Sequence, residues 1–86
     1  MRMIRRYDLA SYYVDSAGGG GTTICYALVF DEHGEMLVEE HRRYEPFQQD
    51  GVSLIRPAEF DNYTIAGAPL RQLVLRKLQE ILPEGD

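Results

Sequence analysis

The chain has 86 residues, of which 44% are hydrophobic and 27% are charged, and its formal net charge at pH 7 is −5. A chain of this length is expected to form one domain, residues 1–86, around a single small core. No segment approaches the ~20 apolar residues that cross a bilayer, and the basic start lacks the apolar run of a signal peptide. The acidic balance disfavours direct binding to DNA or RNA, because phosphate contacts supply most of that affinity.

Cys25 is the single cysteine and has no partner for an internal disulfide. It lies within an apolar run, so the sequence predicts a small buried thiol in a reducing compartment. A cytoplasmic location is therefore expected.

Two strands are expected before the first polar turn. Residues 4–15 alternate, with Tyr7, Leu9, Ser11 and Tyr13 predicted on one face and Asp8, Ala10, Tyr12 and Val14 on the other. Residues 22–31 are apolar on both faces, a larger one with Ile24, Tyr26, Leu28 and Phe30 and a smaller one with Thr23, Cys25, Ala27 and Val29. Such a strand is typically central.

Four glycines, Gly18 to Gly21, separate these two strands. A phosphate-binding loop would lead into a helix N-terminus. Here a strand follows and the loop has no lysine, so the glycines are interpreted as a flexible hairpin connection.

A second hairpin is expected around residues 31–34, with Gly34 in the left-handed conformation. The third strand, residues 35–44, places Met36, Val38 and Tyr44 on one face and ends at Pro46. Residues 52–55 suggest a short fourth strand, and residues 57–60 a single helical turn.

The C-terminal segment predicts an amphipathic helix with Pro69 in its first turn. Its apolar stripe comprises Leu70, Leu73, Val74, Leu78, Ile81 and Leu82, widened by Leu75, and Pro83 and Gly85 end it. The predicted fold class is α+β, a three- or four-stranded antiparallel meander with one C-terminal α-helix packed on one face. The other face is expected to need a cover from a second copy or another protein.

The order of features from Tyr13 to Glu39 resembles the opening hairpins of the ribonuclease H-like fold. That resemblance implies that Asp15 is the first metal-binding carboxylate, at the end of the first strand. The family also carries a glutamate early in the helix after its third strand, whereas the only glutamate in this helix is Glu80, near its far end. Two-metal hydrolysis needs several converging carboxylates. The resemblance therefore implies a catalytically inactive relative, with Asp15 as the one candidate metal ligand.

No catalytic residue, bound metal or other cofactor is predicted from the remaining residue types. His33 and His41 are expected on the surface without a second ligand at zinc-like spacing, and nothing near Cys25 in the sequence would activate it. The chain is not expected to be an enzyme.

Charge and tyrosine content point to a protein-binding role. The glutamates around the second hairpin form either a solvated, partly paired surface or an acidic surface that docks on a basic groove, and the tyrosines are either interface anchors or core. The predicted partner-binding residues are Tyr12, Tyr13, Glu32, Glu35, Glu39, Glu40 and Tyr44.

The expected function is a small acidic intracellular protein-binding module. Its expected role is an inhibitor or accessory protein, of the type that mobile elements encode, acting on a nucleic-acid-handling protein. The alternatives are a catalytically inactive ribonuclease H-like, nucleic-acid-associated domain, and a homodimer that binds a small molecule between its uncovered sheet faces.

Overall fold

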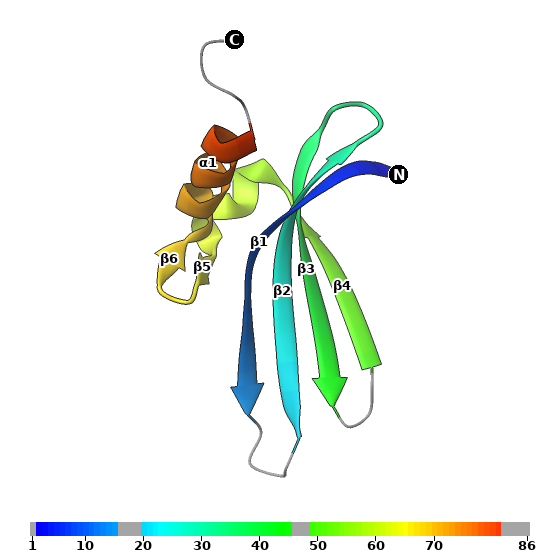
Figure 1. The fold of residues 1–86 in the computed structure, drawn as a ribbon, viewed down its shortest axis with the longest axis vertical. Coiled ribbons are helices and arrows are strands. Elements are labelled where there is room, and N and C mark those ends of the chain that lie inside the picture. The colour runs from blue at the N-terminus through cyan, green and yellow to red at the C-terminus, as the bar shows by residue number, and fades with distance from the viewer. Residues whose placement is uncertain (1, 16–19, 46–48, 82–86) are drawn as a thin grey trace.

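The structure, a computed structural model, describes residues 2–15, 20–45 and 49–81. Its centre is a four-stranded antiparallel sheet whose strands are neighbours in chain order. They are β1 (Met3–Asp15), β2 (Gly21–Asp31), β3 (Met36–Glu45) and β4 (Gln49–Ile55). One short 3-10 helix, a small hairpin and the C-terminal helix α1 (Leu70–Ile81) lie together on one side of the sheet (Figure 1). The predicted α+β meander with a C-terminal helix is confirmed.

Some sequence predictions fall outside the described residues. They concern Gly18, Gly19, Pro46, Leu82, Pro83 and Gly85.

β2 is a central strand, as its two apolar faces predicted, because it pairs with β1 on one side and with β3 on the other. Its larger face lies under the helical elements, and Leu28 is fully buried there between Tyr7 of β1 and Val38 of β3. We call this side of the sheet the helix-side face and the opposite side the far face.

β1 contains an irregularity that changes which of its side chains share a face. Asp8 and Ala10 oppose consecutive residues of β2, so Leu9 is an extra residue in the strand. A bulge of this kind reverses the alternation beyond it. Tyr7 and Tyr12, predicted on opposite faces, both pack against the helix-side core. The predicted strict alternation along residues 4–15 is therefore wrong.

The helical layer consists of the 3-10 helix η1 (Pro57–Asn62), the small hairpin of β5 (Thr64–Ile65) and β6 (Ala68–Pro69), and α1. It covers a core comprising Tyr26, Leu28, Val38, Ile55, Phe60, Ile65, Leu70 and Val74. Burial of such side chains stabilises the fold by roughly 1.5–3 kcal/mol each. An ion pair between Arg71 and Asp61, 2.6 Å from Nε to Oδ1, joins α1 to η1.

The helix departs from its prediction at two positions. It begins at Leu70, directly after Pro69, which belongs to β6. Leu75 does not widen the apolar stripe, because its side chain is 55% exposed. The position lies about 100° around the helix from buried Val74, and that rotation carries it beyond the sheet contact.

The far face is partly buried by the chain itself. Ala27, Val29 and Leu37 form a second cluster there. An ion pair between Arg6 of β1 and Glu39 of β3 joins the two strands on either side of β2. Since Arg6 opposes Val29 and Glu39 opposes Ala27, this pair crosses β2 above the cluster. The expectation that a second chain must cover this face is wrong for these three apolar residues.

Candidate functional site

The lower ends of the four strands extend past the helical layer (Figure 1). At these lower ends, the strand register aligns side chains of the helix-side face in two neighbouring rows across the sheet. One row contains Tyr12, Ile24 and Arg42, and the next contains Val14 and Tyr44 on either side of β2. We call these five residues, Tyr12, Val14, Ile24, Arg42 and Tyr44, the strand-end patch.

A buried polar pair supports the patch from its core side. The Tyr26 hydroxyl donates a hydrogen bond of 2.6 Å to Oε2 of Glu40, and both residues are buried. Burial, and then the hydrogen bond to Glu40, raise the pKa of the Tyr26 hydroxyl well above its ordinary value. The ring of Tyr12 stacks on that of Tyr26, with the ring centroids 6.4 Å apart. Tyr12 is thereby held in place by groups that are themselves fixed.

Arg42 compensates the buried charge of Glu40 and reaches the surface of the patch. Its Nη2 lies 2.7 Å from Oε1 of Glu40, and its side chain is about half exposed. A hydrogen bond with Tyr44, and then the charge of Glu40, raise the pKa of the Arg42 guanidinium. The two charges therefore cancel within the chain, and the patch presents aromatic and guanidinium groups in a fixed arrangement.

Large apolar side chains are exposed at the strand ends. In the patch, Val14 is 48% exposed and Tyr44 is 38% exposed. On the far face, Tyr13 is 54% exposed, and its ring lies so close to buried Gly21 that a Cβ at that glycine would overlap it. Exposed aromatic and apolar groups held on strands are suited to contact with another protein.

The predicted partner-binding residues do not form one surface. Tyr12, Glu40 and Tyr44 lie on the helix-side face, although Glu40 is buried beneath the patch. Tyr13 and Glu39 lie on the far face.

The predicted acidic surface is reduced by pairing within the chain. Glu39 is paired with Arg6, and Glu40 with Arg42. Glu32 and Glu35, at the turn between β2 and β3, remain exposed. This turn lies at the end of the sheet opposite the strand-end patch (Figure 1).

The sequence-based set of partner-binding residues missed three members of the patch, Val14, Ile24 and Arg42. The signal for Arg42 was present: Glu40 and Arg42 are two residues apart in one strand, so their side chains share a face. Val14 was placed correctly relative to Tyr12, but the sequence did not show that the helical layer stops before it.

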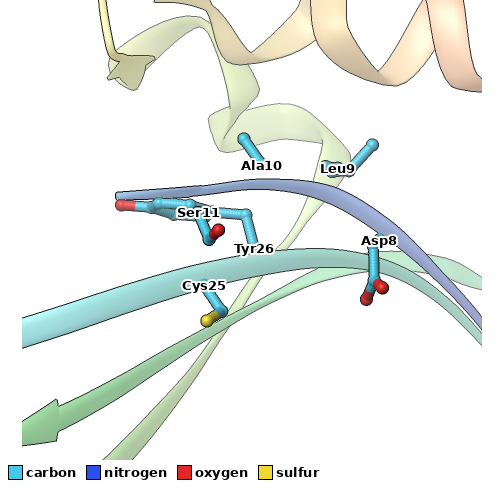
Figure 2. Close-up of a pocket in the computed structure, with 6 residues that line it drawn as sticks. All are labelled: Asp8, Leu9, Ala10, Ser11, Cys25 and Tyr26. Carbon is cyan, nitrogen blue, oxygen red and sulfur yellow. The ribbon is translucent and has the colours of Figure 1, made fainter. Parts of the chain in front are cut away.

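A shallow groove of about 250 Å³ lies at the bulge of β1. Figure 2 shows Leu9 and Ala10 on the side of the helical layer, with Asp8 and Cys25 pointing to the other side. Cys25 is exposed, so the prediction of a buried thiol is wrong. It lies on the far face, which the helical layer does not cover, and its cross-strand neighbour on β3 is His41.

The candidate metal ligand Asp15 is exposed at the end of β1, opposite Gly21. Among the described residues, no three His, Cys, Asp or Glu side chains are grouped closely enough to hold a metal ion. Within the same residues, no helix combines the length and apolar character needed to span a membrane.

Comparisons with protein-family models, with curated proteins and with solved structures gave no match.

Proposed function

We propose that this chain is a small acidic protein-binding module of the cytoplasm, which acts as an inhibitor or accessory protein on a nucleic-acid-handling protein. The observation that carries the proposal is the extension of the sheet past its helical layer. That extension exposes Val14 and Tyr44 beside Tyr12 and Arg42, on strands whose positions are fixed by the ladder. Rigid aromatic anchors lose little conformational entropy on binding, and tyrosine and arginine are enriched where binding energy concentrates.

Charge supports a basic partner. The chain carries a net charge of −5, and Glu32 and Glu35 are exposed at the end of the sheet opposite the strand-end patch. Proteins that handle nucleic acid present basic surfaces to phosphate, and an acidic protein is attracted to such surfaces over long range. Because Glu40 cancels the charge of Arg42, the patch itself adds no net repulsion.

The test is affinity capture with matched variants. A Val14→Lys/Tyr44→Ala variant removes the apolar contacts of the patch at positions that are already exposed, so the fold is expected to survive. Leu75→Lys is the control, because Leu75 is also exposed but lies on α1. Circular dichroism and thermal unfolding verify that all three chains fold.

We expect one protein to be retained by wild type and by Leu75→Lys and lost by the patch variant. The purified partner should lose nucleic-acid binding or processing activity, or change it, when the wild-type chain is added, and its association should slow with added salt. A partner retained equally by all three chains, or one with no nucleic-acid activity, would contradict the proposal.

The second proposal is a catalytically inactive ribonuclease H-like, nucleic-acid-associated domain. What supports it is the exposed Asp15 at the end of the first strand of an antiparallel meander. Titration with Mn²⁺, followed by NMR, tests it, because a bound ion should broaden the amides around Asp15 in wild type and not in Asp15→Asn. Uniform or absent broadening would rule the second proposal out.

A further inference from the structure

β4 is an edge strand, because the strand order places it at one border of the sheet. Among the described residues, its one paired neighbour is β3, and its outer side pairs with no further strand. The helical layer lies toward the other border, beside β1 (Figure 1). The outward N–H and C=O groups of an edge strand can pair with a further strand.

The two edges of the sheet differ in regularity. β1 has two register shifts, one near its start and one at Leu9. β4 pairs with β3 without interruption from Gln49 to Ile55. Its sequence, QDGVSLI, contains no proline and no lysine, which are residues that commonly protect an edge from pairing. β4 is thus the regular and unprotected edge of this sheet.

The exposed side chains of β4 are apolar on the far face. Val52 is 60% exposed and Leu54 is 44% exposed. They oppose His41 and Glu39 of β3, so both lie on the far face. Arg56, the next residue after β4, is the N-cap of η1, and its backbone N–H and C=O are bonded to Glu59, so the edge open to pairing ends at Ile55.

We propose that β4 pairs antiparallel with β4 of a second copy of this chain, with a twofold axis at Ser53. This register places Val52 opposite Leu54 of the second copy, and the reciprocal pair forms by symmetry, which is the cross-strand apolar contact that stabilises sheets. It also sets Gly51 opposite Ile55 of the second copy. An interface of this kind is self-complementary and closes after two copies.

The pairing joins the two sheets into one continuous eight-stranded sheet, twice the four strands of each copy. Because the axis is perpendicular to the sheet, both helical layers lie on the same side, and the two strand-end patches point in opposite directions along it. A dimer of this form presents two patches and binds a repeated or dimeric target more tightly than one copy does. The inference goes beyond the proposed function, since it concerns the chain alone.

Sedimentation equilibrium of the purified chain tests the dimer without any partner. The wild type is expected to approach twice its mass of 9.9 kDa with rising concentration. Val52→Lys/Leu54→Lys places like charges opposite one another across the twofold axis and should weaken dimerisation at least about tenfold. Leu75→Lys, exposed on α1, should dimerise as wild type does.

A symmetric disulfide cross-link tests the register. It does so independently of the double lysine variant, so the test holds even if that variant does not fold. Oxidation of Cys25→Ser/Ser53→Cys should yield a covalent dimer, because the two thiols meet at the axis. Cys25→Ser/Ser11→Cys should not, because Ser11 is exposed on β1, at the other border of the sheet. A wild type that stays monomeric up to about 1 mM, a dimer unaffected by the two lysines, or a dimer without the Ser53→Cys cross-link would each overturn the proposal. None of these results bears on capture by the strand-end patch, so the two proposals fail separately.

Discussion

Glu40 is a buried carboxylate that the chain tolerates because two different groups satisfy it. The Tyr26 hydroxyl donates to one oxygen, and the Arg42 guanidinium lies against the other. An unpaired buried charge is strongly destabilising, whereas a buried charge that is paired and hydrogen-bonded can persist. Tyr26 and Glu40 support the strand-end patch from its core side, and Arg42 is part of the patch. The stability of the fold and the shape of the patch therefore depend on the same contacts.

Replacement of Glu40 by alanine should therefore destabilise the protein. The change leaves the buried Tyr26 hydroxyl without its acceptor, which we expect to lower the free energy of unfolding by about 2–3 kcal/mol. Glu39→Ala is the matched control on the neighbouring position, because its partner Arg6 is half exposed, and it should cost about 1 kcal/mol or less. Urea unfolding measures the free energy of unfolding of both variants. Equal decreases would show that the Tyr26–Glu40 hydrogen bond contributes no more to stability than the exposed ion pair does.

The raised pKa of Tyr26 predicts a loss of stability in alkali. The neutral phenol is the form that the fold favours, so its stabilisation is complete below the unfolded pKa of about 10 and is lost as the pH rises above it. The absorbance of tyrosinate in the near ultraviolet counts the phenolic protons released. At about pH 11, folded wild type and folded Tyr26→Phe should release equal numbers of these protons. When both proteins are unfolded in urea at the same pH, wild type should release one phenolic proton more than Tyr26→Phe. An extra proton already lost from the folded wild type would contradict the assignment.

The turn between β2 and β3 is organised by one buried side chain. Oδ1 of Asp31 accepts hydrogen bonds from the backbone N–H groups of His33, at 2.8 Å, and Glu35, at 2.9 Å. Gly34 adopts a φ of 82°, as the sequence predicted, which a residue with a Cβ rarely does. Polar side chains that bond their own backbone in this way are common turn formers.

Asp31→Ala should unfold at a lower urea concentration than Asp31→Asn. Alanine leaves both N–H groups without their acceptor, at a cost of about 1–3 kcal/mol, whereas the amide oxygen of asparagine can still accept. Should the asparagine variant lose as much stability as the alanine variant, the hydrogen bonds of this turn would not explain the role of Asp31.

The hairpin between β5 and β6 carries backbone strain at Ala66. Ala66 has a φ of 50° and Gly67 a φ of 85°, the combination of a tight two-residue turn. Alanine in the left-handed region costs about 1–2 kcal/mol. Ala66→Gly should thus raise the free energy of unfolding by about 0.5–1 kcal/mol. Ala68→Gly, in β6, should lower the free energy of unfolding by about as much. If both variants were less stable than wild type, Ala66 would not be strained.

The elements were largely predictable because they depend on local signals. The apolar residues on both faces of β2 predicted its central position, and the glycine in the second turn predicted the hairpin of β2 and β3. The bulge at Leu9 was not predictable, because no glycine or proline marks it and it depends on how β1 packs beneath α1. Leu75 was misplaced for a similar reason: sequence periodicity does not show how wide a strip of the helix contacts the sheet.

The whole molecule is a long sheet covered over only part of its length. Its principal extents are 51, 29 and 22 Å, whereas a helix of 12 residues spans about 18 Å. The helical layer stops before the lower strand ends (Figure 1), and Val14 and Tyr44 are exposed there. The sequence predicted a sheet with too little cover, but it did not show which apolar residues lack cover. The far-face cluster is buried within the chain, next to the Arg6–Glu39 pair, whereas apolar groups are exposed at the strand ends and at Val52 and Leu54 of β4.

The strand-end patch is the surface that we propose contacts a partner. The direct measurement is NMR mapping of the amide signals of this chain as the captured partner is added. We predict that the signals of Tyr12, Val14, Ile24, Arg42 and Tyr44 shift or broaden first, while those of η1 and α1 remain in place. Changes concentrated in η1 and α1, with the five patch residues unaffected, would show that the partner binds elsewhere on the chain.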